Sequence, residues 1–381
     1  MLIVIDSKHA PVSSAFRQLG SVRFLQTQEI SRSMIRDADA LVVRSETRVD
    51  EALLDGTRIR FVGTGTIGTD HVDLAYLKRR GIGFASAPGS NANSVAEYIV
   101  AALLVLADRF NIRLRGTTIG IVGIGNIGSR VERIARALGM RVLANDPPLQ
   151  RVTGDPRFVP LDDLMQADIV TLHVPLTRDG DDVTYHLFEG RRIGSMKRGS
   201  ILLNTSRGSV VETGALAQAL RSGHLAGAVI DVWENEPAID RELLSLTTLA
   251  TPHIAGYSFD GKVNAARLMY DALCSYSGLS VPWRDPEDLP LPPAPTLRLP
   301  ENLRSLEGIL GFAVRRCYDI EQDDAHLKAT LGRTGGDAAE LFRNLRAQYP
   351  VRREFSATHL EIPAIYDAVR PALDALGFSL R

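Results

Sequence analysis

The stretch that decides the fold reads Ile119-Gly120-Ile121-Val122-Gly123-Ile124-Gly125-Asn126-Ile127-Gly128. Its apolar start predicts a buried strand, and a helical pattern follows the glycines. Between a strand and a helix, G-x-G-x-x-G spacing is typical of a turn whose backbone N–H groups approach a pyrophosphate at the helix N-terminus. We therefore expect cofactor contacts at Gly123, Gly125, Asn126, Ile127 and Gly128. The alternative is a glycine turn that serves only packing.

An acidic residue at the end of the next strand strengthens the cofactor interpretation. The segment Arg141–Asn145 reads as a strand and runs into Asp146, which lies 18 residues after Gly128. A carboxylate at this place accepts hydrogen bonds from the ribose hydroxyls and repels a 2′-phosphate, so NAD is the expected cofactor. Arg151 lies close in the sequence and leaves NADP open.

Short apolar segments alternate with helical patterns on both sides of this turn. The expected strands are 2–5, 40–43, 59–62, 82–84, 117–122, 141–145, 168–172, 200–204, 228–231 and 248–250. In the first part, the expected helices are 12–19, 51–54 and 72–80. Such alternation predicts parallel sheets covered on both faces, and hence an α/β fold with two Rossmann-like, doubly wound domains.

The domain boundaries follow from a long helix and from a proline-rich stretch. A helix is expected from Ser94, paired with Glu97 in a capping box, to about Arg109. Seven prolines between 282 and 300 indicate a stiff linker. The expected domains are a substrate-binding lid (1–93 and 257–284), an NAD-binding domain (94–256), and the linker with a small C-terminal α+β domain (285–381). Helices are expected at 261–277, which returns to the first unit, and at 337–348.

Composition excludes several classes of function. A formal net charge of -1 over 381 residues shows no nucleic-acid footprint, and the two cysteines lack metal-type spacing. The N-terminus lacks the pattern of a signal peptide, and the longest apolar run is too short to span a bilayer. We expect no metal, no nucleic acid, no membrane partner and a cytoplasmic location.

Three segments at the ends of expected strands carry unusual polar groups: 204–208, 231–237 and 251–257. Ligands of open α/β sheets bind beyond the carboxyl ends of the strands, so these segments are expected to converge. His253 suits a base that takes the hydroxyl proton of a 2-hydroxy acid, with Glu236 beside it to orient the ring and stabilise its charged form. Arg207 suits the substrate carboxylate, and Asp231 the nicotinamide end of the cofactor. Each residue alone is explained as readily by an ordinary loop.

Together these motifs resemble the D-isomer-specific 2-hydroxyacid dehydrogenase family over roughly residues 1–280. The stretch His173-Val174-Pro175-Leu176-Thr177 and the set Asn91, Ser94, Ala96 and Glu97 add to the likeness. The resemblance implies two Rossmann-like domains with the active site in the cleft, a homodimer, and catalytic roles for Arg207, Glu236 and His253. It also implies further cofactor contacts at Pro175, Thr205, Ser206, Asp231 and Gly256.

Within the family, three features resemble a member that acts on a phosphorylated four-carbon 2-hydroxy acid. They are the segments 253–258, 43–47 with 63–71, and a C-terminal segment that resembles a dimerisation domain. The resemblance implies a small phosphorylated 2-hydroxy acid as substrate, bound by Ser45, Thr66, Tyr257 and Arg44. The start, Asp6–Pro11, departs from that pattern.

Two alternatives stay open. One is another dehydrogenase of the family, such as one acting on 3-phosphoglycerate. The other is an NAD-sensing, corepressor-like protein that binds partners without turning substrate over. The complete set of Arg207, Glu236 and His253 favours an enzyme.

Overall fold

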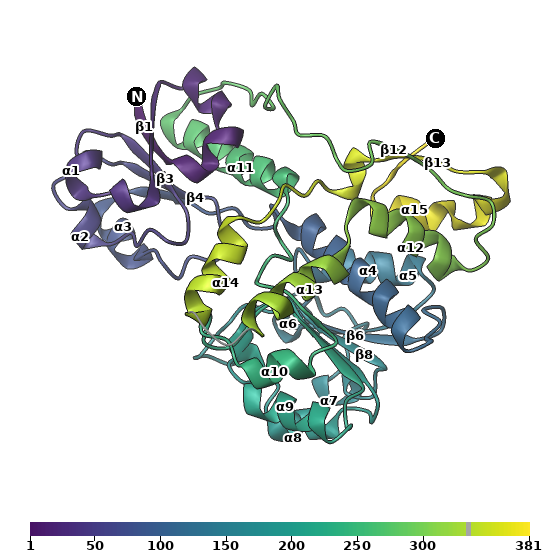
Figure 1. Ribbon diagram of the computed structural model, residues 1–381. Coiled ribbons are helices and arrows are strands. Elements are labelled where there is room, and N and C mark those ends of the chain that lie inside the picture. Colours follow the sequence, from purple (N-terminus) through teal and green to yellow (C-terminus); the bar gives the residue numbers. More distant parts are fainter. Residues whose placement is uncertain (333–336) are drawn as a thin grey trace. The chain divides into compact units, whose positions relative to one another are not determined.

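The computed structural model describes residues 1–332 and 337–381 (Figure 1). The chain divides into two compact units, which are 1–91 with 257–290, and 92–256 with 291–381. Each unit contains a parallel sheet with helices on both faces, so the α/β class and the doubly wound sheets expected from the sequence are confirmed.

The first unit is built on a five-stranded parallel sheet of order β2-β1-β3-β4-β5. Its strands are β1 (Leu2–Asp6), β2 (Ser21–Leu25), β3 (Ala40–Val43), β4 (Phe61–Thr64) and β5 (Gly83–Ala85). Successive residues alternate between two cores: Ile3 and Ile5 of β1 face one, and Val4 faces the other. This alternation is what a sheet buried on both faces requires.

Helices and 3-10 turns cover both faces of this sheet. They are η1 (Ser7–Val12), η2 (Ser14–Gln18), η3 (Thr27–Glu29), α1 (Arg32–Ile35), α2 (Glu51–Leu54), α3 (Leu74–Arg80) and α11 (Phe259–Ser277). The long helix α11 arrives from late in the sequence and packs on β4, β5 and η1, as its expected return to this unit requires. The helix predicted at 12–19 is replaced by two 3-10 turns that break at Ser13, and β2 was not predicted.

The second unit contains a six-stranded parallel sheet of order β11-β10-β9-β8-β6-β7. Its strands are β6 (Thr118–Val122), β7 (Arg141–Asn145), β8 (Ile169–Leu172), β9 (Ile201–Asn204), β10 (Gly227–Ile230) and β11 (Leu249–Ala250). The chain winds outward in both directions from β6 and β8, so the loops after these strands lie at the switch point where such sheets bind nucleotides.

The helices of this sheet lie in two layers. They are α4 (Ala92–Arg109), α5 (Gly128–Ala137), α6 (Pro147–Thr153), α7 (Leu161–Leu164), α8 (Gly190–Ser195), η4 (Gly208–Val210), α9 (Thr213–Arg221) and α10 (Arg241–Leu246). The core on one face joins α4 and α5 to the sheet, and the core on the other face joins α7 to α10.

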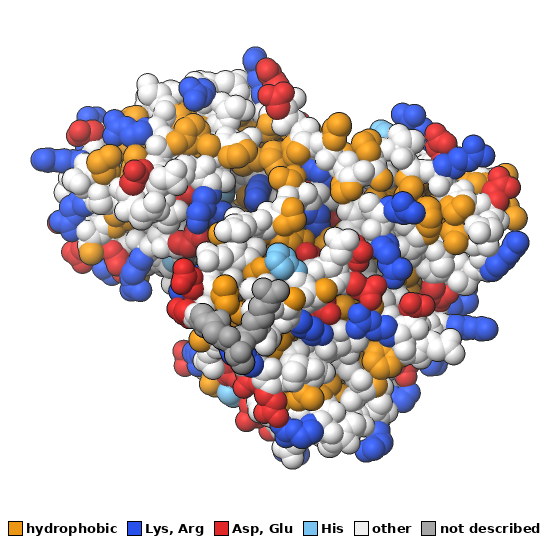
Figure 2. All heavy atoms as spheres, viewed as in Figure 1, with side chains coloured by type: hydrophobic (Ala, Val, Ile, Leu, Met, Phe, Trp, Pro, Cys, Tyr) orange, Lys and Arg blue, Asp and Glu red, His pale blue; other side chains and the backbone are white. Residues whose placement is uncertain are grey.

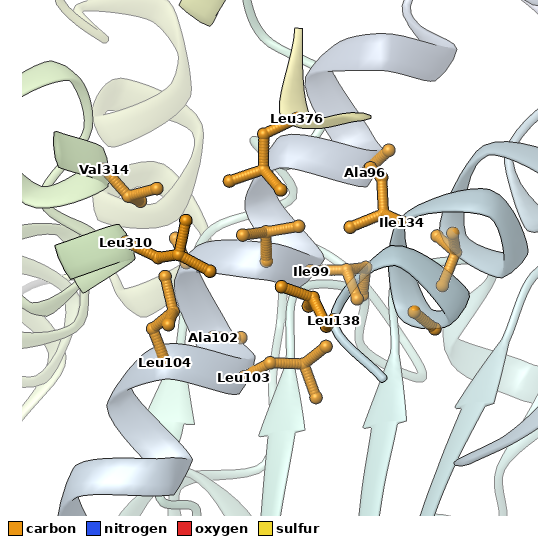
Figure 3. Packing of buried hydrophobic residues seen from close by; sticks show 14 of the residues in the cluster. Ala96, Ile99, Ala102, Leu103, Leu104, Ile134, Leu138, Leu310, Val314 and Leu376 are labelled. Atoms are coloured by element: carbon orange, nitrogen blue, oxygen red, sulfur yellow. The ribbon is translucent and has the colours of Figure 1, made fainter. Parts of the chain in front are cut away.

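The C-terminal segment shares its core with the rest of the second unit. It contains β12 (Thr296–Arg298), α12 (Leu306–Cys317), α13 (Ile320–Leu331), α14 (Ala338–Ala347), η5 (Phe355–Ala357), β13 (His359–Glu361), η6 (Ala364–Val369), α15 (Arg370–Leu376) and β14 (Ser379–Leu380). Figure 3 shows Leu310 and Val314 of α12 and Leu376 of α15 beside helix α4, which carries Ile99 and Leu104. A small C-terminal domain was expected for 285–381; its small parallel sheet β12-β13-β14 and these helices continue the core of α4 and α5.

The same segment corrects the expected start of α4. The helix begins at Ala92, so Ser94 lies within its first turn and the predicted capping box is wrong. The Ser94 hydroxyl donates to Oε1 of Glu354 (2.8 Å), and Oε1 of Glu97 accepts from the N–H of Phe355 (2.7 Å). Both side chains are buried against the C-terminal segment. Their hydrogen-bond partners therefore come from residues far away in the sequence and not from the N-terminus of α4 itself.

In Figure 2, positive and negative side chains are interspersed over the visible surface, in keeping with a net charge near zero. No helix in the part of the chain that the structure describes is long and apolar enough to cross a membrane. Within 1–332 and 337–381, no group of three or more His, Cys, Asp or Glu side chains is placed to hold a metal ion.

Candidate active site

The glycine turn after β6 is tight where the fold requires it and open where a ligand would approach. Gly123 has φ +90°, a left-handed conformation that favours glycine, and its N–H donates to Asn145 O (2.8 Å). A Cβ on Gly128 would lie 1.9 Å from Gly123 O, so α5 starts in contact with the turn. A Cβ on Gly125 would meet nothing within 4 Å. The open backbone at Gly125, followed by a helix N-terminus, fits a pyrophosphate.

A cavity of about 830 Å³ lies at this turn, beyond the carboxyl ends of β6, β7 and β8. Asp146 lines it with a carboxylate held from two sides: Oδ2 accepts from the N–H of Ile124 (2.8 Å), and Oδ1 accepts from the N–H of Leu149 (2.9 Å). Val174 and Pro175 contribute apolar lining. Apolar walls around one fixed carboxylate fit the adenosine half of a dinucleotide.

The charge around this cavity favours NAD over NADP. Asp179 and Asp181 line it together with Asp146, and a 2′-phosphate would face their repulsion. Arg151, the cation that had left NADP open, forms an ion pair with Asp182. Its charge is therefore already balanced within the protein.

The loop after β9 uses its polar groups to hold its own shape. Oδ1 of Asn204 accepts from the backbone N–H (3.1 Å) and from the hydroxyl (2.8 Å) of Ser206. Thr205 is buried, and its hydroxyl lies 3.5 Å from Nδ1 of His173, whose pKa is lowered to about 3 by desolvation. Their side chains thus support the loop, and any contact of Thr205 or Ser206 with the cofactor remains a prediction.

Close backbone packing brings Arg207 beside the loop after β10. A Cβ on Gly208 would lie 2.0 Å from the carbonyl carbon of Trp233, so only glycine fits at this point. The carbonyl oxygen of Arg207 accepts from Nδ2 of Asn204 (3.0 Å), and the Arg207 guanidinium donates to Ser206 O (2.8 Å). The approach at Gly208 places Arg207 next to the segment that carries Glu236.

His253 and Glu236 form a hydrogen-bonded pair, with 2.7 Å between Nδ1 of His253 and Oε2 of Glu236. The other Glu236 oxygen accepts from the N–H of Trp233 (2.7 Å). Burial by itself raises the pKa of Glu236, but the charge and hydrogen bond of His253, the Trp233 N–H and the charge of Arg346 lower it below its usual value. Glu236 is therefore an anion that orients the imidazole.

Asp231 fixes the loop on which His253 lies. Its buried carboxylate accepts from the Thr251 hydroxyl (2.6 Å) and from the N–H groups of Ile254 (2.7 Å) and Ala255 (3.0 Å). His253 itself has φ +58°, and its N–H donates to Asp231 O (2.7 Å). An unfavourable left-handed conformation at a non-glycine residue persists only where its surroundings impose it, and here Asp231 does so. The expected contact of Asp231 and Gly256 with the nicotinamide end remains a prediction.

The four expected substrate residues all lie in the first unit. Arg44 and Ser45 follow β3, Thr66 follows β4, and Tyr257 precedes α11. The Thr66 hydroxyl is engaged locally, since it lies 2.8 Å from the Thr64 hydroxyl and donates to Gly68 O (2.9 Å). The loop after β4 can therefore offer backbone N–H groups more readily than this hydroxyl.

Sequence reasoning missed the groups that the C-terminal segment adds. The positive charge of Arg346 in α14 acts on Glu236. Arg352 is buried, donates to Ala255 O (3.0 Å) and Ser94 O (2.7 Å), and lies over the ring of Tyr318. No local motif marks such residues, because their partners are far away in the chain.

A glycine turn with a fixed acid at the switch point, followed by Arg207, Glu236 and His253 on successive strand-end loops, defines a nicotinamide-dependent dehydrogenase. Comparisons with known proteins agree. Residues 104–255 match the family model described as "D-isomer specific 2-hydroxyacid dehydrogenase, NAD binding domain". Residues 289–377 match a domain of unknown function.

Two relatives are named erythronate-4-phosphate dehydrogenase. The protein from Salinibacter ruber is 49% identical over 361 residues, 92% of each chain. The protein from Marinobacter nauticus is 40% identical over 384 residues, covering both chains completely. Among solved structures, Aquifex aeolicus D-lactate dehydrogenase, complexed with NAD and lactic acid, is similar with 26% identity and a TM-score of 0.58, covering 73% of this chain and 96% of that one.

The chain belongs to the D-isomer-specific 2-hydroxyacid dehydrogenase family, and it is an NAD-dependent oxidoreductase. The family resemblance and the NAD cofactor expected from the sequence are thereby confirmed. The likeness to members that act on a phosphorylated 2-hydroxy acid is also confirmed, by the names of these two relatives.

Proposed function

We propose that this enzyme oxidises 4-phospho-D-erythronate to (R)-3-hydroxy-2-oxo-4-phosphooxybutanoate with NAD, a step in pyridoxine phosphate biosynthesis. The observation that carries the proposal is the His253–Glu236 pair (2.7 Å) behind an NAD-type glycine turn, in a chain whose full-length relatives are named for this substrate. The other family substrates and a corepressor-like role lack comparable support.

Bound NAD would accept the hydride that leaves C2 of the substrate. His253 takes the proton of the C2 hydroxyl at Nε2, because Nδ1 is engaged by Glu236. The negative Glu236 stabilises the resulting imidazolium, so the C2–O bond can become a carbonyl as hydride departs. Arg207 holds the substrate carboxylate and polarises the C2 oxygen. Ser45, Thr66, Tyr257 and Arg44 are the proposed substrate contacts of the first unit.

Turnover assays distinguish the possible functions. NADH formation is measured with 4-phospho-D-erythronate, 3-phosphoglycerate and D-lactate at equal concentrations. The proposal requires the highest kcat/KM with 4-phospho-D-erythronate. A higher value with 3-phosphoglycerate would assign the enzyme to that branch of the family, and NAD binding without turnover of any of the three would favour a corepressor-like role.

We also propose that the enzyme is a homodimer, with residues 285–381 contributing to its interface. The support is the family resemblance of the sequence. Sedimentation of the full chain measures the mass directly. A monomer at micromolar concentration would refute the proposal.

A further inference from the structure

Three positively ionisable residues gather at the carboxyl end of the sheet in the first unit. His9 lies in η1 directly after β1, Arg44 follows β3, and Lys262 lies in the first turn of α11. In the order β2-β1-β3-β4-β5, the winding direction reverses between β1 and β3. The loops after these two strands therefore flank a switch point, where open parallel sheets bind ligands.

Backbone and ring contacts bring the three residues together. The N–H of Gly65 donates to Val43 O (3.0 Å), which joins the loop that carries Arg44 to the loop after β4. The ring of His9 lies against Gly65, where a Cβ would be 2.2 Å from its Cε1. Helix α11 packs on η1, the turn that contains His9, and so brings Lys262 to the same place.

The charges of Arg44 and Lys262 repel each other. The side chain of Lys262 is exposed, and partial desolvation, followed by the charge of the neighbouring Arg44, lowers its pKa. Burial, followed by the charge of Arg44, lowers the pKa of His9 to about 4, so this imidazole is neutral at pH 7. Arg44 is half-buried and Lys262 is exposed, so the two cations face solvent and are open to an anion that would offset their repulsion.

In the part of the chain that the structure describes, no carboxylate forms an ion pair with Arg44 or Lys262. Within the described residues, the side chains of Arg44 and Lys262 form no ion pair or hydrogen bond, and Nε2 of His9 is buried without a hydrogen-bond partner. Neighbouring cations do have partners, since Lys8 pairs with Glu46 and Arg48 pairs with Asp50, both at 2.9 Å.

The nearby Asp6 is also occupied. Its two carboxylate oxygens accept hydrogen bonds from the N–H of Lys8 (2.9 Å) and from the hydroxyl of Thr27 (2.7 Å). Asp6 therefore supports the loop after β1. Its charge acts on His9 and raises the pKa of that imidazole, but within the described residues Asp6 forms no ion pair with Arg44 or Lys262.

We propose that Arg44 and Lys262 form an anion subsite for the phosphate group of the substrate. The ring of His9 lines this subsite. The assignment rests on the proposed function for the identity of the substrate. A phosphate monoester carries about -1.5 to -2 charges at pH 7, which matches two cations, whereas a carboxylate carries one and is assigned to Arg207. Sequence reasoning gave Arg44 this role only in part, and it missed Lys262 and His9.

The first test compares a phosphorylated with an unphosphorylated substrate. Lys262→Met should raise KM for 4-phospho-D-erythronate by about 10- to 100-fold, the effect of losing one charge-assisted contact, and leave KM for D-erythronate within about 2-fold. Lys262→Arg should restore most of the affinity. The matched control is Arg267→Met on the same helix, whose guanidinium pairs with Asp271 (3.8 Å) and which should change neither value. Equal losses with both substrates would overturn the subsite.

The second test does not depend on turnover. Inorganic phosphate is titrated calorimetrically into the wild type, Lys262→Met, Arg44→Met and Arg267→Met, each checked for folding by thermal melting. The subsite requires phosphate binding by the wild type and by Arg267→Met, and at least about 10-fold weaker binding by the other two. If 4-phospho-D-erythronate is not oxidised but phosphate binds in this pattern, the proposed function fails and the subsite stands. Phosphate binding that is absent in the wild type or unchanged in both variants refutes the subsite.

Discussion

The carboxyl ends of the two large sheets are built differently. In the second unit, four polar side chains accept hydrogen bonds from backbone N–H groups of their own or neighbouring loops. They are Asp146, Asn204, Asp231 and Glu236. In the first unit, the corresponding end carries Arg44 and Lys262, which pair with no carboxylate in the described part of the chain.

We interpret this difference as one of function: the site in the second unit is organised for catalysis, and the site in the first unit for binding a charged ligand. A catalytic base must be held in one orientation before substrate arrives, and internal hydrogen bonds achieve that for His253. A binding site for a charged ligand instead leaves some of its groups without internal partners, so that the ligand completes them.

The largest effect is expected for His253→Ala, which removes the proposed base. Turnover should fall by about 10²- to 10⁴-fold, the usual contribution of a positioned base, while NAD affinity stays within about 2-fold. Steady-state NADH formation and fluorescence titration of NAD measure the two. His224→Ala is the control, because His224 lies 3.1 Å from Ile193 O and has no role in the proposed site. A His253→Ala enzyme with wild-type kcat would show that the base is another group.

Two glycines of the same turn should behave differently. Gly128→Ala forces a Cβ to 1.9 Å from Gly123 O, so both NAD affinity and stability should fall, the latter by about 1–3 kcal/mol. Gly125→Ala meets nothing within 4 Å, so Tm should stay unchanged, while the Cβ blocks the pyrophosphate and weakens NAD by about 10-fold or more. Full NAD affinity in Gly125→Ala would place the cofactor elsewhere.

Acid should weaken the first unit through His9. Its pKa is lowered from 6.5 to about 4, so the unfolded chain binds this proton first as the pH falls. The stability of this unit is therefore complete above pH 6.5 and decreases between pH 6.5 and 4 by about 1.4 kcal/mol per pH unit. Hydrogen exchange of amides in 1–91, in phosphate-free buffer, should show this decrease, and His9→Gln should reduce it.

The exposed His326 provides the control, since His326→Gln should leave the acid dependence of the first unit unchanged. If His9→Gln loses stability with the same slope as the wild type over this pH range, His9 is not an uncharged residue that lines the anion subsite.

The smallest effect is expected for Glu236→Gln, which keeps a polar group beside His253 but removes its negative charge. The imidazolium that forms as His253 takes the proton is then no longer stabilised, so turnover should fall by about 10-fold, or about 1.4 kcal/mol, less than in His253→Ala. Glu234→Gln removes the carboxylate of a second pair, with His186 (2.6 Å), and should leave turnover unchanged. A wild-type kcat in Glu236→Gln would remove Glu236 from the proton chemistry.

Much of the second unit was predictable because its signals are local. The apolar strand, the glycine spacing and the next strand ending at Asp146 specify one βαβ unit, and the structure forms it with β6, α5 and β7. Alternate burial in successive strands then requires a parallel sheet with two covered faces. The position of polar residues at strand ends also indicated the segments 204–208, 231–237 and 251–257, which contain Glu236 and His253.

The remainder could not be read from sequence because the partners are distant. Ser94 and Glu97 have the spacing of a capping box, yet they bond to Glu354 and Phe355, about 260 residues later. Arg346 and Lys262 have no motif, and only packing brings them to Glu236 and Arg44.

The sequence by itself determined most strands of the two large sheets, the glycine turn and the order of the catalytic residues, since periodicity and turn chemistry act within about 30 residues. Only the tertiary structure decided which charges are balanced and which are left for a ligand. Electrostatic balance depends on distances between groups remote in the chain, and those distances are set by how the helices pack.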